Sequence, residues 1–130
     1  MFDKLTIFAK ANDLALHAAA RQSVIAQNVA NADTPGYRAR DVAPFAETYQ
    51  PDRTDQMRAT RSGHFGAGLA TTPVAEDNVV YRAGATSPNG NSVSLETEMM
   101  MAAEAKRDHD MALAVYKSTL GIVRSSLGRR

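Results

Sequence analysis

Residues 26–37, Ala-Gln-Asn-Val-Ala-Asn-Ala-Asp-Thr-Pro-Gly-Tyr, end a long alanine-rich helical pattern abruptly. Asn28 and Asn31 are unfavourable inside a helix, because their amides compete for backbone hydrogen bonds. Pro35 keeps the residue before it out of the α conformation, and Gly36 can adopt a positive φ. The stretch therefore predicts a helix that stops and a turn that redirects the chain, although an ordinary helix C-terminus would satisfy the same local chemistry.

The segment before this stop has the periodicity of one amphipathic helix, from about Asp3 to Asn31. Its length would be about 42 Å at the usual rise per residue. The many alanines on its apolar face favour close approach of a second helix. The face has a gap near Arg21 and Gln22, and its members are Ile7, Ala11, Leu14, Ala18, Ile25, Val29 and Ala32.

The middle of the chain, residues 34–92, is rich in proline, glycine and mixed charges. Val42, Phe45 and Tyr49 could form one helical turn or a short extended anchor, and Val79–Tyr81 predicts a short strand. Asn89-Gly90 is typical of a tight turn. So long an irregular connection is unusual in a compact domain, and residues 60–72 have a flexible composition. The connection is either a disordered or extended linker or a segment that neighbouring molecules order, and we expect the second.

A second amphipathic helix is predicted over residues 93–130, with Ser94 as its N-cap. Glu96, Glu98 and Glu104 are expected to form a solvated face, the first two also favouring the helix dipole. Large apolar residues predict a heptad seam in which Leu113 and Leu120 are buried. Its two rows, imperfect at Lys106 and His109, are Leu95, Ala102, His109, Tyr116 and Val123, and Met99, Lys106, Leu113, Leu120 and Leu127.

Composition excludes several classes of protein. The 130 residues carry a net charge of +1 without a basic block, so nucleic-acid binding is not indicated. The chain has no cysteine, which removes disulfides and thiolate metal sites. The first residues, with Asp3 and Lys4 among apolar positions, do not have the pattern of a signal peptide, and no segment has the length of a transmembrane helix.

An enzyme is not predicted, because no catalytic set can be assembled. His17, His64 and His109 are far apart in the sequence. His17 is expected on the surface, and His109 in a helix contact rather than at a metal. The glycines of residues 63–68 do not form a phosphate loop, since no strand precedes them and no Gly-Lys-Ser/Thr follows. No cofactor is expected.

A helical adaptor or secretion chaperone that binds an amphipathic partner helix would share the two long helices. It would not need the proline–glycine stop or the long irregular middle. That alternative stays open on the residues alone.

Two motifs resemble those of the flagellar axial family of rod and hook proteins. The first ends the N-terminal helix, and Gln27 replaces its usual asparagine. The second opens the C-terminal helix. Their residues here are Ala26, Gln27, Asn28, Val29, Ala30, Asn31, Thr34, Pro35, Gly36 and Tyr37, and then Gly90, Asn91, Val93, Leu95, Glu98 and Met99.

Within this family, the short chain and the run Tyr37-Arg-Ala-Arg-Asp41 are similar to a proximal rod protein, with the related FlgC as the nearest competitor. The segment Thr60-Arg-Ser-Gly-His64-Phe favours the same assignment. The resemblance implies a structural subunit that polymerises helically between the membrane ring and export gate and the distal rod. It also implies type III export without a cleaved signal.

The implied partners are other copies of the chain, the rod proteins FlgC, FlgF and FlgG, and FliE with the membrane ring and export gate. The terminal helices are expected to be poorly ordered before assembly, because a short helix pair buries little surface. Arg38, Arg40 and Asp41 could form salt bridges between subunits. The expected motif and subunit-contact residues are Asn28, Ala30, Asn31, Thr34, Pro35, Gly36, Tyr37, Arg38 and Asp41.

The predicted fold is mainly α, with the terminal helices paired as an antiparallel coiled-coil-like unit and joined by an irregular middle with at most short β elements. One structural unit is divided into residues 1–33, 34–92 and 93–130. The expected helix seam comprises Ile7, Leu14, Ile25, Val29, Leu95, Met99, Leu113, Tyr116, Leu120, Val123 and Leu127.

Overall fold

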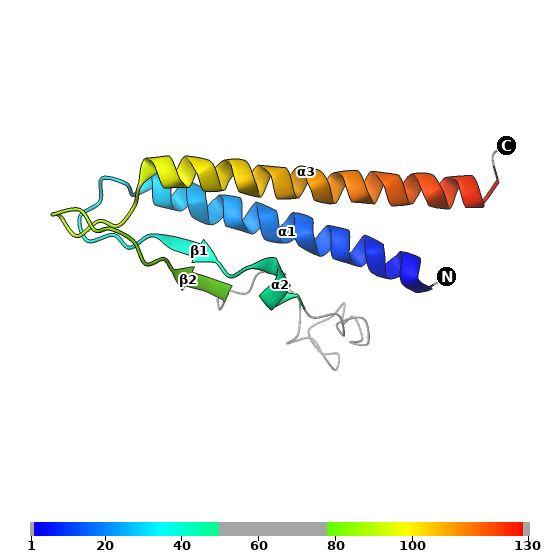
Figure 1. The fold of residues 1–130 in the computed structure, drawn as a ribbon, viewed down its shortest axis with the longest axis horizontal. Coiled ribbons are helices and arrows are strands. Elements are labelled where there is room, and N and C mark those ends of the chain that lie inside the picture. The colour runs from blue at the N-terminus through cyan, green and yellow to red at the C-terminus, as the bar shows by residue number, and fades with distance from the viewer. Residues whose placement is uncertain (1, 50–77, 129–130) are drawn as a thin grey trace, which may run out of the picture.

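The structure, a computed structural model, describes residues 2–49 and 78–128. Two long helices dominate it, as the sequence predicted, and a small two-stranded sheet lies beside them (Figure 1). In chain order the elements are α1 (Phe2–Ala30), β1 (Arg40–Val42), α2 (Phe45–Thr48), β2 (Val79–Tyr81) and α3 (Leu95–Ser126).

Helices α1 and α3 lie side by side and run in opposite directions, so both chain ends are at the same end of the molecule (Figure 1). They contain 29 and 32 residues. At 1.5 Å per residue they are about 44 and 48 Å long. The predicted antiparallel helix pair is confirmed.

The most buried part of the contact between the helices is made by small side chains, and the rings of Phe8 and Tyr116 meet nearer the chain ends. On α1, Ala11 and Ala18 are buried and Ile25 continues the row. On α3 the buried residues recur every seven positions: Glu98, Ala105, Ala112 and Thr119. Alanines facing alanines let two helices approach closely, which agrees with the prediction from the alanine-rich first helix. We call this contact the inner seam.

The predicted heptad rows of α3 are only partly borne out within one chain. The ring of Tyr116 packs edge-on against the ring of Phe8 on α1, with centroids 5.2 Å apart. The predicted burial of the other large apolar residues was wrong for most of the row. Met99 is 72 % exposed and Leu127 is 80 % exposed. Leu95, Leu113 and Tyr116 are exposed as well, and Leu120 and Val123 are half-buried. Helix α3 is therefore rotated so that a row of small and polar residues faces α1.

Two predicted seam residues of α1, Ile7 and Val29, are also exposed. Leu14 is half-buried, and Ile25 is buried as predicted. Asn28, fully buried, takes the place in the seam that the pattern assigned to Val29. A pattern of apolar residues cannot predict that Asn28 is buried in place of Val29, because hydrogen bonds rather than apolar contacts make the burial of an asparagine tolerable.

The β ribbon, formed by β1 and β2, packs on one side of the helix pair, next to α1 (Figure 1). Its strands are antiparallel, with Arg40 opposite Tyr81 and Val42 opposite Val79. The strand predicted at Val79–Tyr81 is confirmed.

Helix α2 is a single turn, as one of the two alternatives for this segment proposed, and it places Phe45 against His17 with ring centroids 5.6 Å apart. Val42 belongs to β1 instead. The flexibility expected for residues 60–72 concerns positions outside the described residues.

The two ends of α3 are terminated in different ways. Ser94 occupies the N-cap position, but its side chain makes no capping hydrogen bond. At the other end Gly128 has φ 88°, the left-handed conformation that often follows a helix. Neither α1 nor α3, nor any other helix of the described residues, has a stretch apolar and long enough to cross a membrane.

The inner seam predicts a strong size limit at Ala112. Ala112→Leu inserts three heavy atoms into a close helix contact and should lower the free energy of unfolding by about 1–3 kcal/mol. The exposed neighbour Ala114 is the matched control, and Ala114→Leu should change it by less than about 0.5 kcal/mol. Urea unfolding followed by circular dichroism measures both. Equal effects of the two variants would contradict a close-packed seam at Ala112.

Candidate functional site

The turn after α1 and the loop before α3 are joined through two glycines. Gly36 has φ 71°, which confirms the predicted positive φ, and its N–H donates to the carbonyl of Asn89 at 3.0 Å. Gly90 has φ 82°, and a Cβ built on it would lie 3.3 Å from the Cα of Gly36. Both positions thus require glycine, and each of the two sequence motifs supplies one.

Asn91 joins the second motif to the end of α1. Its buried amide nitrogen lies 2.9, 2.7 and 2.8 Å from the carbonyl oxygens of Asn31, Ala32 and Thr34. Carbonyls at a helix C-terminus have no partner within the helix, so this side chain supplies the donor that the end of α1 lacks. Its own oxygen accepts the N–H of Val93 at 2.7 Å.

Asn31 and Gln27 make more local contacts. The amide of Asn31 donates to the carbonyl of Gln27 at 2.8 Å. Gln27, the departure from the family motif, accepts a hydrogen bond from the guanidinium of Arg40 at 2.9 Å. The substitution thus leaves a working polar contact between α1 and β1.

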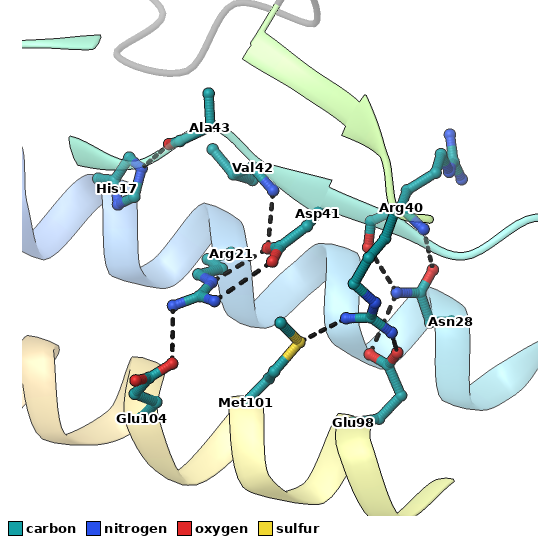
Figure 2. Close-up of polar contacts among 11 residues, drawn as sticks. His17, Arg21, Asn28, Arg40, Asp41, Val42, Ala43, Glu98, Met101 and Glu104 are labelled. Atoms are coloured by element: carbon teal, nitrogen blue, oxygen red, sulfur yellow. Dashed lines mark hydrogen bonds and ion pairs between the residues drawn. The ribbon is translucent and has the colours of Figure 1, made fainter. Parts of the chain in front are cut away.

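Asn28 holds the start of β1 against α1. Its amide nitrogen donates to the carbonyl of Arg40 at 2.6 Å and to Glu98 Oε2 at 3.1 Å (Figure 2). Its oxygen accepts the N–H of Arg40 at 3.1 Å and the hydroxyl of Tyr37 at 3.3 Å. This buried amide is a hub between α1, β1 and α3.

Glu98 is fully buried and paired with a cation, so its predicted place on a solvated face was wrong. Arg82, directly after β2, donates to Glu98 Oε1 and also contacts the sulfur of Met101. We call Asn28, Arg82 and Glu98 the polar node. It links α1, the β ribbon and α3, and every buried side-chain nitrogen and oxygen in the described residues has a hydrogen-bond partner.

Arg21 explains the gap in the apolar pattern of α1. Its guanidinium donates to both carboxylate oxygens of Asp41, at 3.0 and 3.2 Å, and to Glu104 at 3.3 Å (Figure 2). The hydrogen bond to Asp41 raises the pKa of Arg21 above its ordinary value, against the opposing effect of burial. Glu104, expected on a solvated face, instead pairs with Arg21 across the helices.

Asp41 pairs with Arg21 within the chain, and its salt bridge to another subunit stays a prediction. The nearby Arg38 stacks over the ring of Tyr81, with 4.8 Å to its centroid. Arg40 contacts Gln27 and the hydroxyl of Tyr37, and that hydrogen bond to Tyr37 raises the pKa of Arg40.

The predicted motif residues fall into two groups. Asn28, Tyr37 and Asp41 contact other parts of the same chain. The second group is exposed, although Thr34 and Gly36 contact the chain through their backbone and Arg38 stacks on Tyr81. The role of this group in an assembly stays a prediction. The exposed members are Ala30, Thr34, Pro35, Gly36 and Arg38.

The histidines take part in packing. His17, predicted on the surface, is half-buried and bonded through Nε2 to the carbonyl of Ala43 at 2.8 Å (Figure 2). His109 is half-buried on α3, and His64 lies outside the described residues. In the described part of the chain, no group of three or more histidine or acidic side chains is arranged to hold a metal ion.

Gly36 provides a test of the turn. Gly36→Val should lower the free energy of unfolding by about 1–3 kcal/mol, because a β-branched residue is strained at positive φ. Gly84→Val is the matched control, since a Cβ at either glycine meets no atom within 4 Å but only Gly36 has the positive φ. Denaturant unfolding of the two variants provides the comparison. A Gly36→Val chain as stable as the Gly84→Val chain would contradict the requirement.

Asn91 provides a test of the joint between the motifs. Asn91→Asp keeps the shape but replaces the donor amide by an acceptor, which would face three carbonyl oxygens. We expect a loss of about 1–3 kcal/mol, the range for a buried unsatisfied group. Asn12→Asp, at an exposed position of α1, is the control. Hydrogen exchange at the end of α1 should accelerate in the first variant only, and unchanged exchange there would rule out the capping role.

Comparison with known proteins agrees with this geometry. A family model described as "Flagella basal body rod protein" matches residues 16–38, the second half of α1 and the turn. The flagellar basal body rod protein FlgB of Agrobacterium fabrum is 37 % identical over 100 residues, 75 % of each chain. FlgB of Escherichia coli is 35 % identical and FlgB of Salmonella typhimurium 31 % identical, each over 129 residues and 92 % of both chains. These relatives carry the name FlgB, not that of the competitor FlgC, and the chain belongs to the FlgB family of flagellar basal body rod proteins.

Proposed function

We propose that this chain builds the rod by packing an apolar stripe of α3 against helices of neighbouring subunits. Membership of the FlgB family makes it a structural, non-enzymatic subunit of the flagellar basal body rod. The apolar stripe consists of the exposed members of the two heptad rows read from the sequence, excluding Tyr116, whose ring packs against Phe8 of α1. Its residues are Leu95, Met99, Leu113 and Leu127.

The single observation that carries the proposal is that large apolar side chains of the heptad rows are left exposed outside the inner seam. Met99, Leu113 and Leu127 are exposed although they have coiled-coil spacing. Large exposed apolar surface on a folded chain usually marks an interaction site, and heptad spacing specifies a helix as the partner.

The position of the stripe leaves room for such a partner. Glu104 faces the ribbon side of the helix pair, where it meets Arg21 (Figure 2). Leu113 follows nine residues later, which is about two and a half helical turns, so it lies on the opposite side of α3. A neighbouring helix can therefore approach the apolar stripe without displacing the β ribbon.

The rest of the proposal follows the resemblance of the two motifs. The rod proteins FlgC, FlgF and FlgG, FliE with the membrane ring and export gate, and further copies of the chain are the proposed partners. The proposed place is the proximal rod in the periplasm, reached by type III export without a cleaved signal. Residues 1–33 and 93–130 would form the packed core of the rod, and residues 34–92 would lie outside it.

A substitution at Leu113 can distinguish an effect on rod assembly from an effect on folding of the chain. Leu113→Glu should lower the free energy of unfolding of the free chain by less than about 1 kcal/mol, because the side chain is 40 % exposed. In the rod, however, it would place a charge in an apolar contact, and rods and swimming motility should be lost.

Ser118→Glu is the matched control, since it adds the same charge at an exposed position of α3 outside the stripe. It should leave motility intact. Normal rods in cells that carry Leu113→Glu would overturn the proposal, whatever the control shows. Rod assembly is measured by isolating basal bodies, and motility in soft agar.

A further inference from the structure

Helix α3 carries two rows that could face α1. One is the inner seam, with Glu98, Ala105, Ala112 and Thr119. The other is the apolar stripe, which contains Met99 and Leu113 and has the larger side chains. Burial of apolar area alone favours the stripe, because it would remove more hydrophobic surface from water. The structure buries the other row, so something other than apolar area selects the face.

The polar node is placed to make that selection. Glu98 is fully buried between the amide of Asn28 on α1 and the guanidinium of Arg82 after β2. Met99 directly follows Glu98, so rotating α3 to bring Met99 toward α1 would turn Glu98 by about 100°. That rotation would separate the carboxylate from both partners, and a buried charge without its partner is strongly unfavourable.

We propose that the polar node determines which face of α3 packs against α1, and so keeps the apolar stripe available on the outside. A buried polar group that specifies one packing arrangement at the expense of stability has precedents in coiled coils. The cation comes from the β ribbon, so the face is selected only when β2 has docked. The consequence for rod assembly rests on the proposed function of the stripe, whereas the selection itself does not.

Single cysteine reporters test the selection, because the native chain has no cysteine. Thr119→Cys reports the inner seam, where the native side chain is 8 % exposed, and Met99→Cys reports the stripe, where it is 72 % exposed. Each reporter is placed in the full-length chain, and its rate of reaction with a maleimide is measured. When the node is intact, the thiol of the Met99→Cys chain should react at least about tenfold faster than the thiol of the Thr119→Cys chain.

The node is then replaced by apolar side chains of similar length in Arg82→Met/Glu98→Met, with Arg82→Leu/Glu98→Leu as a second version. Arg107→Leu/Asp108→Leu is the control, since it removes an ion pair in which Arg107 is 72 % exposed. We expect the node variants to keep their helical circular dichroism, while the ratio of the two rates falls at least about tenfold or inverts. The control should retain the native ratio.

An unchanged ratio in a folded node variant would overturn the inference. Loss of helical signal in both node variants would overturn it as well, because the pair would then hold the fold together rather than select a face. Rod assembly is scored separately. If the ratio changes and rods still form, the selection stands and the proposed role of the apolar stripe fails.

Discussion

The ion pair between Glu98 and Arg82, completed by the amide of Asn28, is the interaction on which the arrangement of this subunit depends. It lies where α1, the β ribbon and α3 meet, and Glu98 has no exposed surface. The pair is not an efficient source of stability, because burying two charges costs about as much as their attraction returns. The ion pair instead fixes the rotation of α3, since the carboxylate of Glu98 reaches its partners in only one rotation of the helix.

That rotation has a consequence for the surface of the subunit. The inner seam buries alanines and polar residues, and it leaves Met99, Leu113 and Leu127 exposed. A single helix pair closed by small side chains buries little apolar area to offset the entropy of ordering the chain. Contacts with neighbours can supply the remainder, as in proteins that fold together with binding. The small apolar area buried in the inner seam and the apolar residues left exposed on α3 both fit a subunit that gains stability from its neighbours.

The elements could be predicted from the sequence, because each depends on local chemistry. Alanine periodicity, the strand at Val79–Tyr81 and the positive φ of Gly36 were all readable from neighbouring residues. The inner seam could not be predicted, because an apolar repeat indicates a contact face without saying which molecule covers it. Arg21, Arg82 and Glu98 were missed for another reason: their partners lie 16 or more residues away, and a charge on a helix ordinarily indicates solvent. The one available signal was at Arg21, a charged residue that interrupts the apolar face of α1 and therefore needs a partner.

A reconstruction of the assembled basal body that resolves the side chains of α3 tests the central claim most directly. The account predicts that Ala105 and Ala112 face α1 of their own chain, while Met99, Leu113 and Leu127 contact helices of neighbouring subunits. It also predicts that Arg82 remains paired with Glu98 in the rod. A rod in which the large apolar residues pack against α1 of the same chain, with Glu98 facing solvent, would contradict it.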